Sequence, residues 1–182
     1  MCIRDRSVPK FYGVDWGAVD PFAVVEVKYY DGALYVHQLN YKSENQLRES
    51  LPLNLLSRLK NEDEGLVKWL FQKFAIEKDR PIICDNNRPE KIKVLRKMGY
   101  GYALATTKGK GSILSGIDLL SGIDVFFTDS SKDIAHEQRN YARKIDRYGV
   151  ILEEPEDEYN HMMDCIRYVA LFLQRQGIIT TI

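Results

Sequence analysis

The sequence predicts an α/β fold with a mixed sheet, in which three antiparallel strands are followed by parallel strands, with helices on both faces. The chain opens with three strand-like segments, and Asp31 with Gly32 forms a strong two-residue hairpin signal between the second and third. From residue 81 onward, short apolar strands alternate with segments of helical spacing. That alternation is typical of parallel strands joined by helices.

The elements follow in order along the chain. In the first half we expect strands at 11–15, 22–30 and 33–40, and helices at 43–60 and 63–78. In the second half we expect strands at 81–85, 102–106 and 125–129, helices at 89–98, 112–120, 131–141 and 159–175, and a hairpin at 144–152. The helix at 89–98 has Pro89 in its first turn and Gly99 as its stop.

Length and composition indicate one domain with a real core: 182 residues, 45% hydrophobic and 29% charged. Lys and Arg number 26, equal to Asp and Glu, so a nucleic-acid surface must be a local patch. Cys2, Cys84 and Cys165 form no CxxC pair, which indicates neither a zinc site nor a disulfide framework, and a reducing, intracellular setting follows weakly. No apolar run approaches the roughly 18 residues that span a bilayer, so no membrane partner is expected.

The opening MCIRDRS matches neither a signal peptide nor the pattern that follows it. It resembles the translated adapter sequence found at the start of some metagenomic gene predictions. We therefore interpret residues 1–8 as a non-native leader and residues 9–182 as the domain, so that natural upstream sequence would be missing.

The stretch FYGVDWG places Asp15 in a strand that should be buried, and a buried charge is costly unless it is paired or binds a metal. Gly13 and Gly17 indicate that another group approaches the backbone closely here. Asp85 ends the strand PIICD, where ligand sites of open α/β sheets form. Asp164 lies beside the apolar stripe of the last helix, which is Met162, Cys165, Ile166, Val169, Phe172 and Leu173. Taken singly, each Asp has a structural alternative: a turn, a strand end, or an Asp164–Arg167 surface pair.

The order of the three aspartates matches a ribonuclease-H-like nuclease: first strand, fourth strand, last helix. In that fold the first and fourth strands are neighbours, so Asp15 and Asp85 would lie side by side, with Asp164 brought in by the last helix. The motifs GVDWG, ICDNNRPEKI, KGKGSILSGI and NHMMDCIRY, in this order, resemble the C-terminal nuclease domain of phage terminase large subunits, over about residues 11–175. Cys165 departs from the small residue, such as Ala, that is usual there.

That resemblance implies an endonuclease that cuts concatemeric double-stranded viral DNA during packaging, with Asp15, Asp85 and Asp164 as catalytic, metal-binding carboxylates. It also implies the terminase small subunit and the portal protein as partners, and action at the procapsid in the host cell cytoplasm. Carboxylates about 4 Å apart repel by roughly 4 kcal/mol per pair at an effective dielectric of about 20, so a compensating cation is needed. Oxygen ligands favour two Mg²⁺ or Mn²⁺ ions, about 3.5–4 Å apart, which would activate water and stabilise the leaving 3′ oxygen.

A local basic patch covers residues 88–110, where the single acid is Glu90. Its cations are Arg88, Lys91, Lys93, Arg96, Lys97, Lys108 and Lys110. We expect Lys108, Lys110 and Arg88 to contact DNA phosphates. For Lys91, Lys93 and Lys97, a solvated helix face is an equal alternative. The spacing in KGKGS is not that of a P-loop, so the ATPase motor is not expected in this chain.

Two further side chains are possible supporting residues. His161 is expected to orient a ligand or contact DNA, or else to make a structural hydrogen bond at the start of the helix. Asn86, with Asn87, is expected to hold the loop of Asp85 by side-chain bonds, or else to touch the metal shell. Asp157 and Glu158 would either add a metal ligand or interact favourably with the dipole of the helix that follows them.

Three rival interpretations stay open. An actin-like or sugar-kinase-like ATPase lobe also begins with GxDxG, although those proteins need two lobes. Another ribonuclease-H-like nuclease, such as a resolvase or transposase core, would carry the same aspartates. A non-catalytic DNA-binding remnant is disfavoured by the intact Asp set.

Overall fold

The computed structural model describes residues 8–51, 62–109, 111–140, 143–145, 151–155 and 160–180. The strands of the main sheet are β1 (Lys10–Asp15), β2 (Ala23–Tyr30), β3 (Ala33–Asn40), β4 (Ile82–Cys84), β5 (Ala103–Ala105) and β6 (Val125–Phe127). The helices are α1 (Glu44–Ser50), α3 (Glu62–Lys73), α4 (Pro89–Lys97), α5 (Ser112–Ser121), α6 (Lys132–Asn140) and α7 (His161–Arg175). A separate hairpin pairs β7 (Arg143–Ile145) with β8 (Ile151–Pro155).

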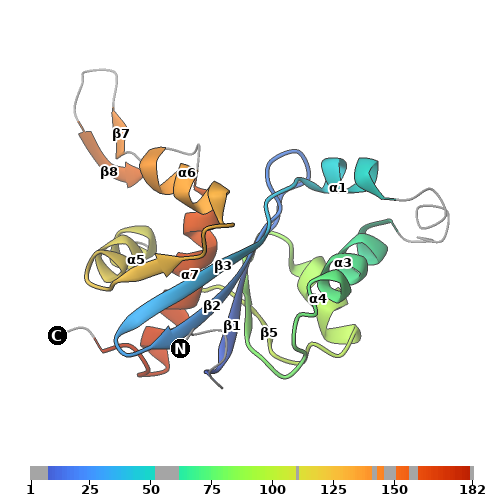
Figure 1. Ribbon diagram of the computed structural model, residues 1–182, viewed down its shortest axis with the longest axis horizontal. Coiled ribbons are helices and arrows are strands. Elements are labelled where there is room, and N and C mark those ends of the chain that lie inside the picture. The colour runs from blue at the N-terminus through green and yellow to red at the C-terminus, as the bar shows by residue number, and fades with distance from the viewer. Residues whose placement is uncertain are drawn as a thin grey trace.

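The main sheet has the strand order β5-β4-β1-β2-β3-β6 (Figure 1). β1, β2 and β3 are antiparallel neighbours, and the turn between β2 and β3 has positive φ at Asp31 and Gly32, as the hairpin signal predicts. β4 lies parallel to β1, β5 parallel to β4, and β6 parallel to β3. The mixed sheet and the pairing of the first and fourth strands confirm the predicted ribonuclease-H-like arrangement. All strands of this sheet except β2 therefore end at the same edge.

Helices cover both faces of the sheet, as predicted. α5, α6 and α7 lie on one side, and α1, α3 and α4 lie on the other (Figure 1). Residues of β2 alternate between the two cores: Val25 packs with α7, and Val24 packs with α1, α3 and α4. None of the described helices has both the length and the apolar character that a membrane span requires.

Gly13 lets α7 lie directly against β1. A Cβ atom at this position would be 2.9 Å from the carbonyl carbon of Cys165 and closer still to its oxygen. Gly17 is similarly enclosed by the backbone of Asp20 and Pro21. The close approach that the two glycines predict is therefore confirmed, and at Gly13 the approaching group is the last helix. Cys165 itself is buried in the core, as expected.

Two predicted helices are too long. α1 ends at Ser50, because Leu51 adopts an extended conformation (φ −79°, ψ 140°) and precedes Pro52, which disfavours a helical residue before it. The rest of the range 43–60 lies outside the described residues. α3 ends at Lys73 rather than residue 78, and Ala75 has a positive φ of 48°. The predicted hairpin at 144–152 is present as β7 and β8, while its turn lies outside the described residues.

Candidate metal centre

Three aspartates come together at the edge where the parallel strands end. Asp15 is the last residue of β1, and Asp85 follows β4, where its N–H donates to the Val14 carbonyl at 2.8 Å. Asp164 lies in the first turn of α7. Burial raises the pKa of Asp15, and the charges of Asp85 and Asp164 raise it further. The structure thus brings together the three residues that the sequence singles out.

Each carboxylate lies against a basic side chain. His161 Nδ1 is 2.9 Å from Asp15 Oδ2, and the Lys108 ammonium forms an ion pair with Asp85 Oδ1. Arg167 Nη2 donates to Asp164 Oδ1 at 2.7 Å. Lys108 and Arg167, and His161 when it is protonated, offset the mutual repulsion of the carboxylates in the protein without ligands.

The carboxylates fit a hard divalent cation in chemistry. Asp85 Oδ1 is fully buried and has no hydrogen-bond partner among the described residues, because its ion pair with Lys108 lacks hydrogen-bond geometry. A buried carboxylate oxygen is costly without a partner, and in this structure the Lys108 ammonium offsets its charge. In the described part of the chain, no group of three or more His, Cys, Asp or Glu side chains is arranged so that it could hold a metal ion. A metal ion bound at Asp85 Oδ1 would take the place of the Lys108 ammonium.

His161 acts on Asp15. The hydrogen bond to Asp15 raises the pKa of His161, burial lowers it, and the charges of Asp15 and Glu137 raise it further. Among the roles expected for His161, the structure shows a hydrogen bond at the start of the helix. Its partner is Asp15, one of the three site carboxylates. The imidazole therefore fixes the orientation of Asp15.

Glu137, on α6, is a site-supporting residue that sequence reasoning missed. It is fully buried, and its Oε2 accepts from the N–H groups of Met162 (2.7 Å) and Met163 (3.1 Å). Its Oε1 accepts from the hydroxyl of Tyr41 at 2.7 Å. Glu137 thereby supplies the cap for α7 that Asn160 does not, and it fixes the helix turn that carries His161 and Asp164. Its position three residues after apolar Ile134, on one helix face, is the available signal.

The Asp164–Arg167 pair is present, but it is not the surface pair that the structural alternative expects. Arg167 is 3% exposed, and its aliphatic stem packs against Gly116 of α5, where a Cβ atom would be 2.6 Å from Arg167 Cδ. The hydroxyl of Tyr168 donates to Asp164 Oδ2 at 3.1 Å. Asp164 is therefore held at both oxygens by buried side chains, which stabilises one orientation of the carboxylate.

The expected basic patch divides in the structure. Lys91 is buried, where it forms an ion pair with Glu44 of α1, so it is neither a DNA contact nor part of a solvated face. Arg88 pairs with Glu90 at 2.7 Å at the exposed start of α4. Lys108 contacts Asp85 rather than pointing into solvent alone. Lys110 lies outside the described residues.

The loop after β4 is not held as predicted. Asn86 is exposed, and its side chain makes no hydrogen bond within the part of the chain that the structure describes. Trp16 instead fixes the loop, because its Nε1 donates to the Asp85 carbonyl at 3.1 Å. Asp157 and Glu158 lie outside the described residues.

No protein-family model matches this sequence, and no curated protein matches it. Solved structures do resemble the fold. The nuclease domain of g2p, the large terminase of bacteriophage SPP1, with bound Mn, has a TM-score of 0.67 and 21% identity, covering 94% of this chain and 88% of that one. The P22 large terminase nuclease domain has a TM-score of 0.54 and 17% identity, covering 93% of this chain and 81% of that one.

The large terminase of a thermophilic bacteriophage has a TM-score of 0.58 and 17% identity, covering 93% of this chain. This chain spans 41% of that protein's length. The strand order, the placement of the helices and these three structural similarities all indicate the same fold. The chain has the ribonuclease-H-like fold of the nuclease domains of phage large terminases.

Proposed function

We propose that this chain is the nuclease domain of a phage DNA-packaging terminase, and that it hydrolyses phosphodiester bonds of concatemeric double-stranded DNA. The observation that carries the proposal is the convergence of Asp15, Asp85 and Asp164 from β1, the end of β4 and α7. The fold shared with the SPP1 and P22 nuclease domains supports it, as does the manganese bound to the SPP1 domain. By the same resemblance, we propose a terminase small subunit and a portal protein as partners, at the procapsid in the host cytoplasm.

Asp15, Asp85 and Asp164 would hold two Mg²⁺ or Mn²⁺ ions through carboxylate oxygens. When bound, such ions lower the pKa of an attacking water and neutralise charge on the leaving 3′ oxygen. His161 orients Asp15 by its hydrogen bond, and Arg167 with Tyr168 orients Asp164. The Lys108 ammonium, once released from Asp85, is placed to bind a DNA phosphate beside the carboxylates.

A plasmid assay tests the proposal. Supercoiled DNA is incubated with the protein in millimolar Mn²⁺, in Mg²⁺, or in chelator, and nicked and linear products are measured. We expect cutting with little sequence preference in one or both metals and none in chelator. Asp15→Asn, Asp85→Asn and Asp164→Asn should each abolish cutting while the protein stays folded.

The assay separates the rival functions. If the wild type leaves DNA intact in both metals, the nuclease proposal is wrong. Near-wild-type cutting by one of the Asn variants would remove that residue from the catalytic set. Preference for four-way junctions over linear duplex would indicate a resolvase instead of a packaging nuclease.

A further inference from the structure

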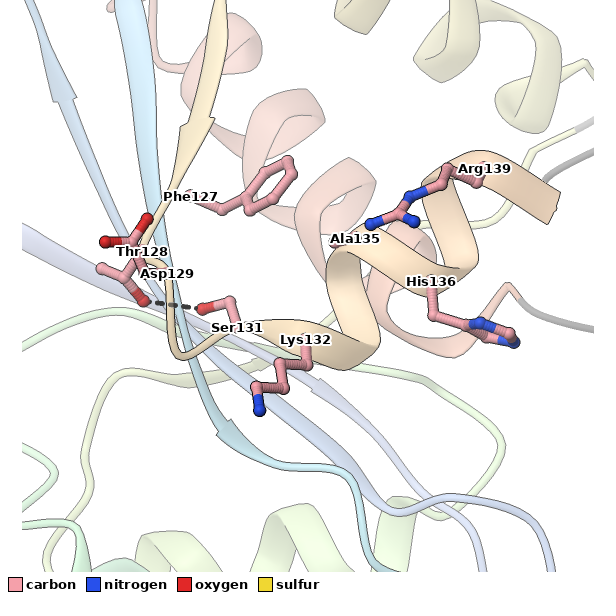
Figure 2. Close-up of a pocket in the computed structure, with 8 residues that line it drawn as sticks. All are labelled: Phe127, Thr128, Asp129, Ser131, Lys132, Ala135, His136 and Arg139. Atoms are coloured by element: carbon pink, nitrogen blue, oxygen red, sulfur yellow. Dashed lines mark hydrogen bonds between the residues drawn. The ribbon is translucent and has the colours of Figure 1, made fainter.

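An open cavity of about 480 Å³ lies between the end of β6 and the outer side of α6 (Figure 2). Three basic side chains project from α6 around it: Lys132, His136 and Arg139. Their spacing of four and three residues places them along one face of the helix. All three are exposed, whereas Ile134 and Glu137 on the opposite face are buried.

The cavity has an excess of positive charge. No ion pair among the described residues involves Lys132 or Arg139. Asp129 is the single acidic residue in the lining. The nearby carboxylate of Asp133 is directed elsewhere, because it accepts a hydrogen bond from Gln38 of β3. Two cations along a helix face, neither in an ion pair with a described residue and with one acid beside them, form a surface suited to a polyanion.

The sheet sets the position of the basic face of α6. β6 ends at the same edge as β1 and β4, so α6 begins at the edge that carries Asp15 and Asp85 (Figure 1). Lys108 follows β5, but its ammonium contacts Asp85 after β4, and α6 follows β6 at the other end of the sheet. Four inter-strand steps at about 4.8 Å separate β4 from β6 by roughly 19 Å. Glu137 joins α6 to the first turn of α7, which fixes this face relative to Asp164.

We propose that the basic face of α6, formed by Lys132, His136 and Arg139, binds the phosphate backbone of duplex DNA on the far side of the cut site from Lys108. The proposal rests on the nuclease function above and adds a second contact to it. Phosphates recur every 3.4 Å or so along one strand, so a span of about 19 Å corresponds to roughly six base pairs. One duplex lying along the edge of the sheet would touch Lys108, the carboxylates and α6 together. Backbone contacts of this kind position DNA without reading its sequence.

The test measures DNA binding in the Asp85→Asn background, so that cutting does not interfere. Labelled duplexes of unrelated sequence are titrated at several salt concentrations with the parent protein, with Lys132→Ala/Arg139→Ala, and with a control. The control is Lys68→Ala/Lys73→Ala, which removes the same charge from exposed positions of α3. Melting temperatures are recorded for all three proteins.

We expect the α6 double variant to melt like its parent and to bind every duplex more weakly. Loss of two phosphate contacts should flatten the slope of log affinity against log salt by about 1.8. Raising salt from about 50 to 200 mM should then weaken parent binding roughly tenfold more than double-variant binding. Lys132→Arg/Arg139→Lys, which keeps both charges, should retain the parent slope.

An unchanged slope in Lys132→Ala/Arg139→Ala, with DNA binding intact, would overturn the α6 contact and leave the nuclease proposal standing. Equal flattening in the α3 control would also overturn it, because the effect would then be one of overall charge. If the parent neither binds duplex DNA nor cuts it before the Asp85→Asn change, the nuclease function itself is wrong. The three results are distinguishable in one set of titrations.

Discussion

At the scale of single residues, Lys108 and a metal ion would compete for one oxygen atom. Asp85 Oδ1 is buried, and its partner in the structure is the Lys108 ammonium, whose side chain is 37% exposed. Moving an exposed lysine costs little, whereas a buried carboxylate is costly to leave without any partner. Lys108 therefore acts as a removable counter-ion for Asp85.

We predict opposite effects of Lys108→Ala on two ligands. Manganese should bind more tightly, because no ammonium has to leave Asp85. DNA should bind more weakly and with a flatter salt dependence, because a phosphate contact is lost. Calorimetric titration with Mn²⁺ and fluorescence titration with duplex DNA measure the two effects, with Lys68→Ala, at an exposed position of α3, as the matched control. Weaker manganese binding in Lys108→Ala would show that the lysine assists the metal site.

The aspartates of the site and the supporting His161 were predictable from sequence, whereas Glu137 and the burial of Arg167 were not. Asp15, Asp85 and Asp164 each stand beside strand or helix signals that fix their place in the fold. Glu137 and Arg167 look like ordinary solvated helix residues, since their burial arises only when α5 and α6 pack against α7. The same holds for Lys91, which becomes buried because Glu44 of α1 lies above α4. Such pairings join distant segments and leave no local pattern.

At the scale of elements, the contact of α7 with β1 sets the position of the site. Gly13→Ala would push a methyl group into the carbonyl of Cys165, one residue from Asp164. We expect unfolding free energy to fall by about 1–3 kcal/mol, as for other overpacked cores. DNA cutting should fall further than the melting temperature alone explains, because α7 carries Asp164. Denaturant unfolding and the plasmid assay measure the two effects.

Gly101 provides the control for that substitution. It is exposed, its φ is not positive, and a Cβ atom there meets nothing within 4 Å. Gly101→Ala should therefore leave both stability and cutting near wild type. If Gly13→Ala behaved like Gly101→Ala, the close approach of the helix would not matter for the site.

The junction of α6 and α7 should carry a pH dependence through Glu137. Burial raises the pKa of Glu137, although hydrogen bonds from Tyr41, Met163 and Met162 lower it. The Glu137 carboxyl of the folded protein therefore stays protonated at a pH where the same carboxyl in the unfolded chain, with its ordinary pKa of 4.5, has lost its proton. Glu137 thus contributes most stability at low pH, and that contribution declines as pH rises from 4.5 through the folded pKa.

Glu137→Gln removes this titration and keeps an oxygen that can accept from the N–H groups of α7. Relative to wild type, the variant should become more stable as pH rises from about 4.5 to 7. Urea unfolding at a series of pH values gives the difference. A gap between the two proteins that is constant over this range would rule out a raised pKa at Glu137.

At the scale of the whole molecule, metal binding should stabilise the fold. An ion that binds only the folded chain raises the free energy of unfolding by RT ln(1 + [L]/Kd), which is about 2.7 kcal/mol at an ion concentration of about 100 times Kd. Melting temperature should therefore rise with millimolar Mn²⁺ or Mg²⁺. Asp85→Asn, which removes one of the proposed ligands, should lose most of the response to metal. A wild-type melting temperature that ignores metal would contradict a site built from these carboxylates.

The overall architecture could be predicted because several local signals agree. Asp31 with Gly32 fixes the hairpin, and alternating apolar residues fix the strands that follow. Strand order came from the placement of aspartates in a known fold, since hydrophobic pattern alone does not say that β4 lies beside β1. The ends of α1 and α3 were less predictable, because Pro52 stops a helix that the apolar spacing would otherwise extend.

The pairing of β1 with β4, and the docking of α7 on both, also has a consequence for the time at which the site exists. During synthesis, Asp15 and Asp85 emerge before α7, whose residues begin at His161. Contacts between segments so far apart in the chain form late in folding, because their loop-closure entropy must first be overcome. A growing or truncated polypeptide that lacks α7 has neither Asp164 nor the helix that holds Asp15 through His161. The carboxylate cluster is therefore absent until α7 has been made. Incomplete chains would lack the proposed catalytic site and would not cut nearby DNA.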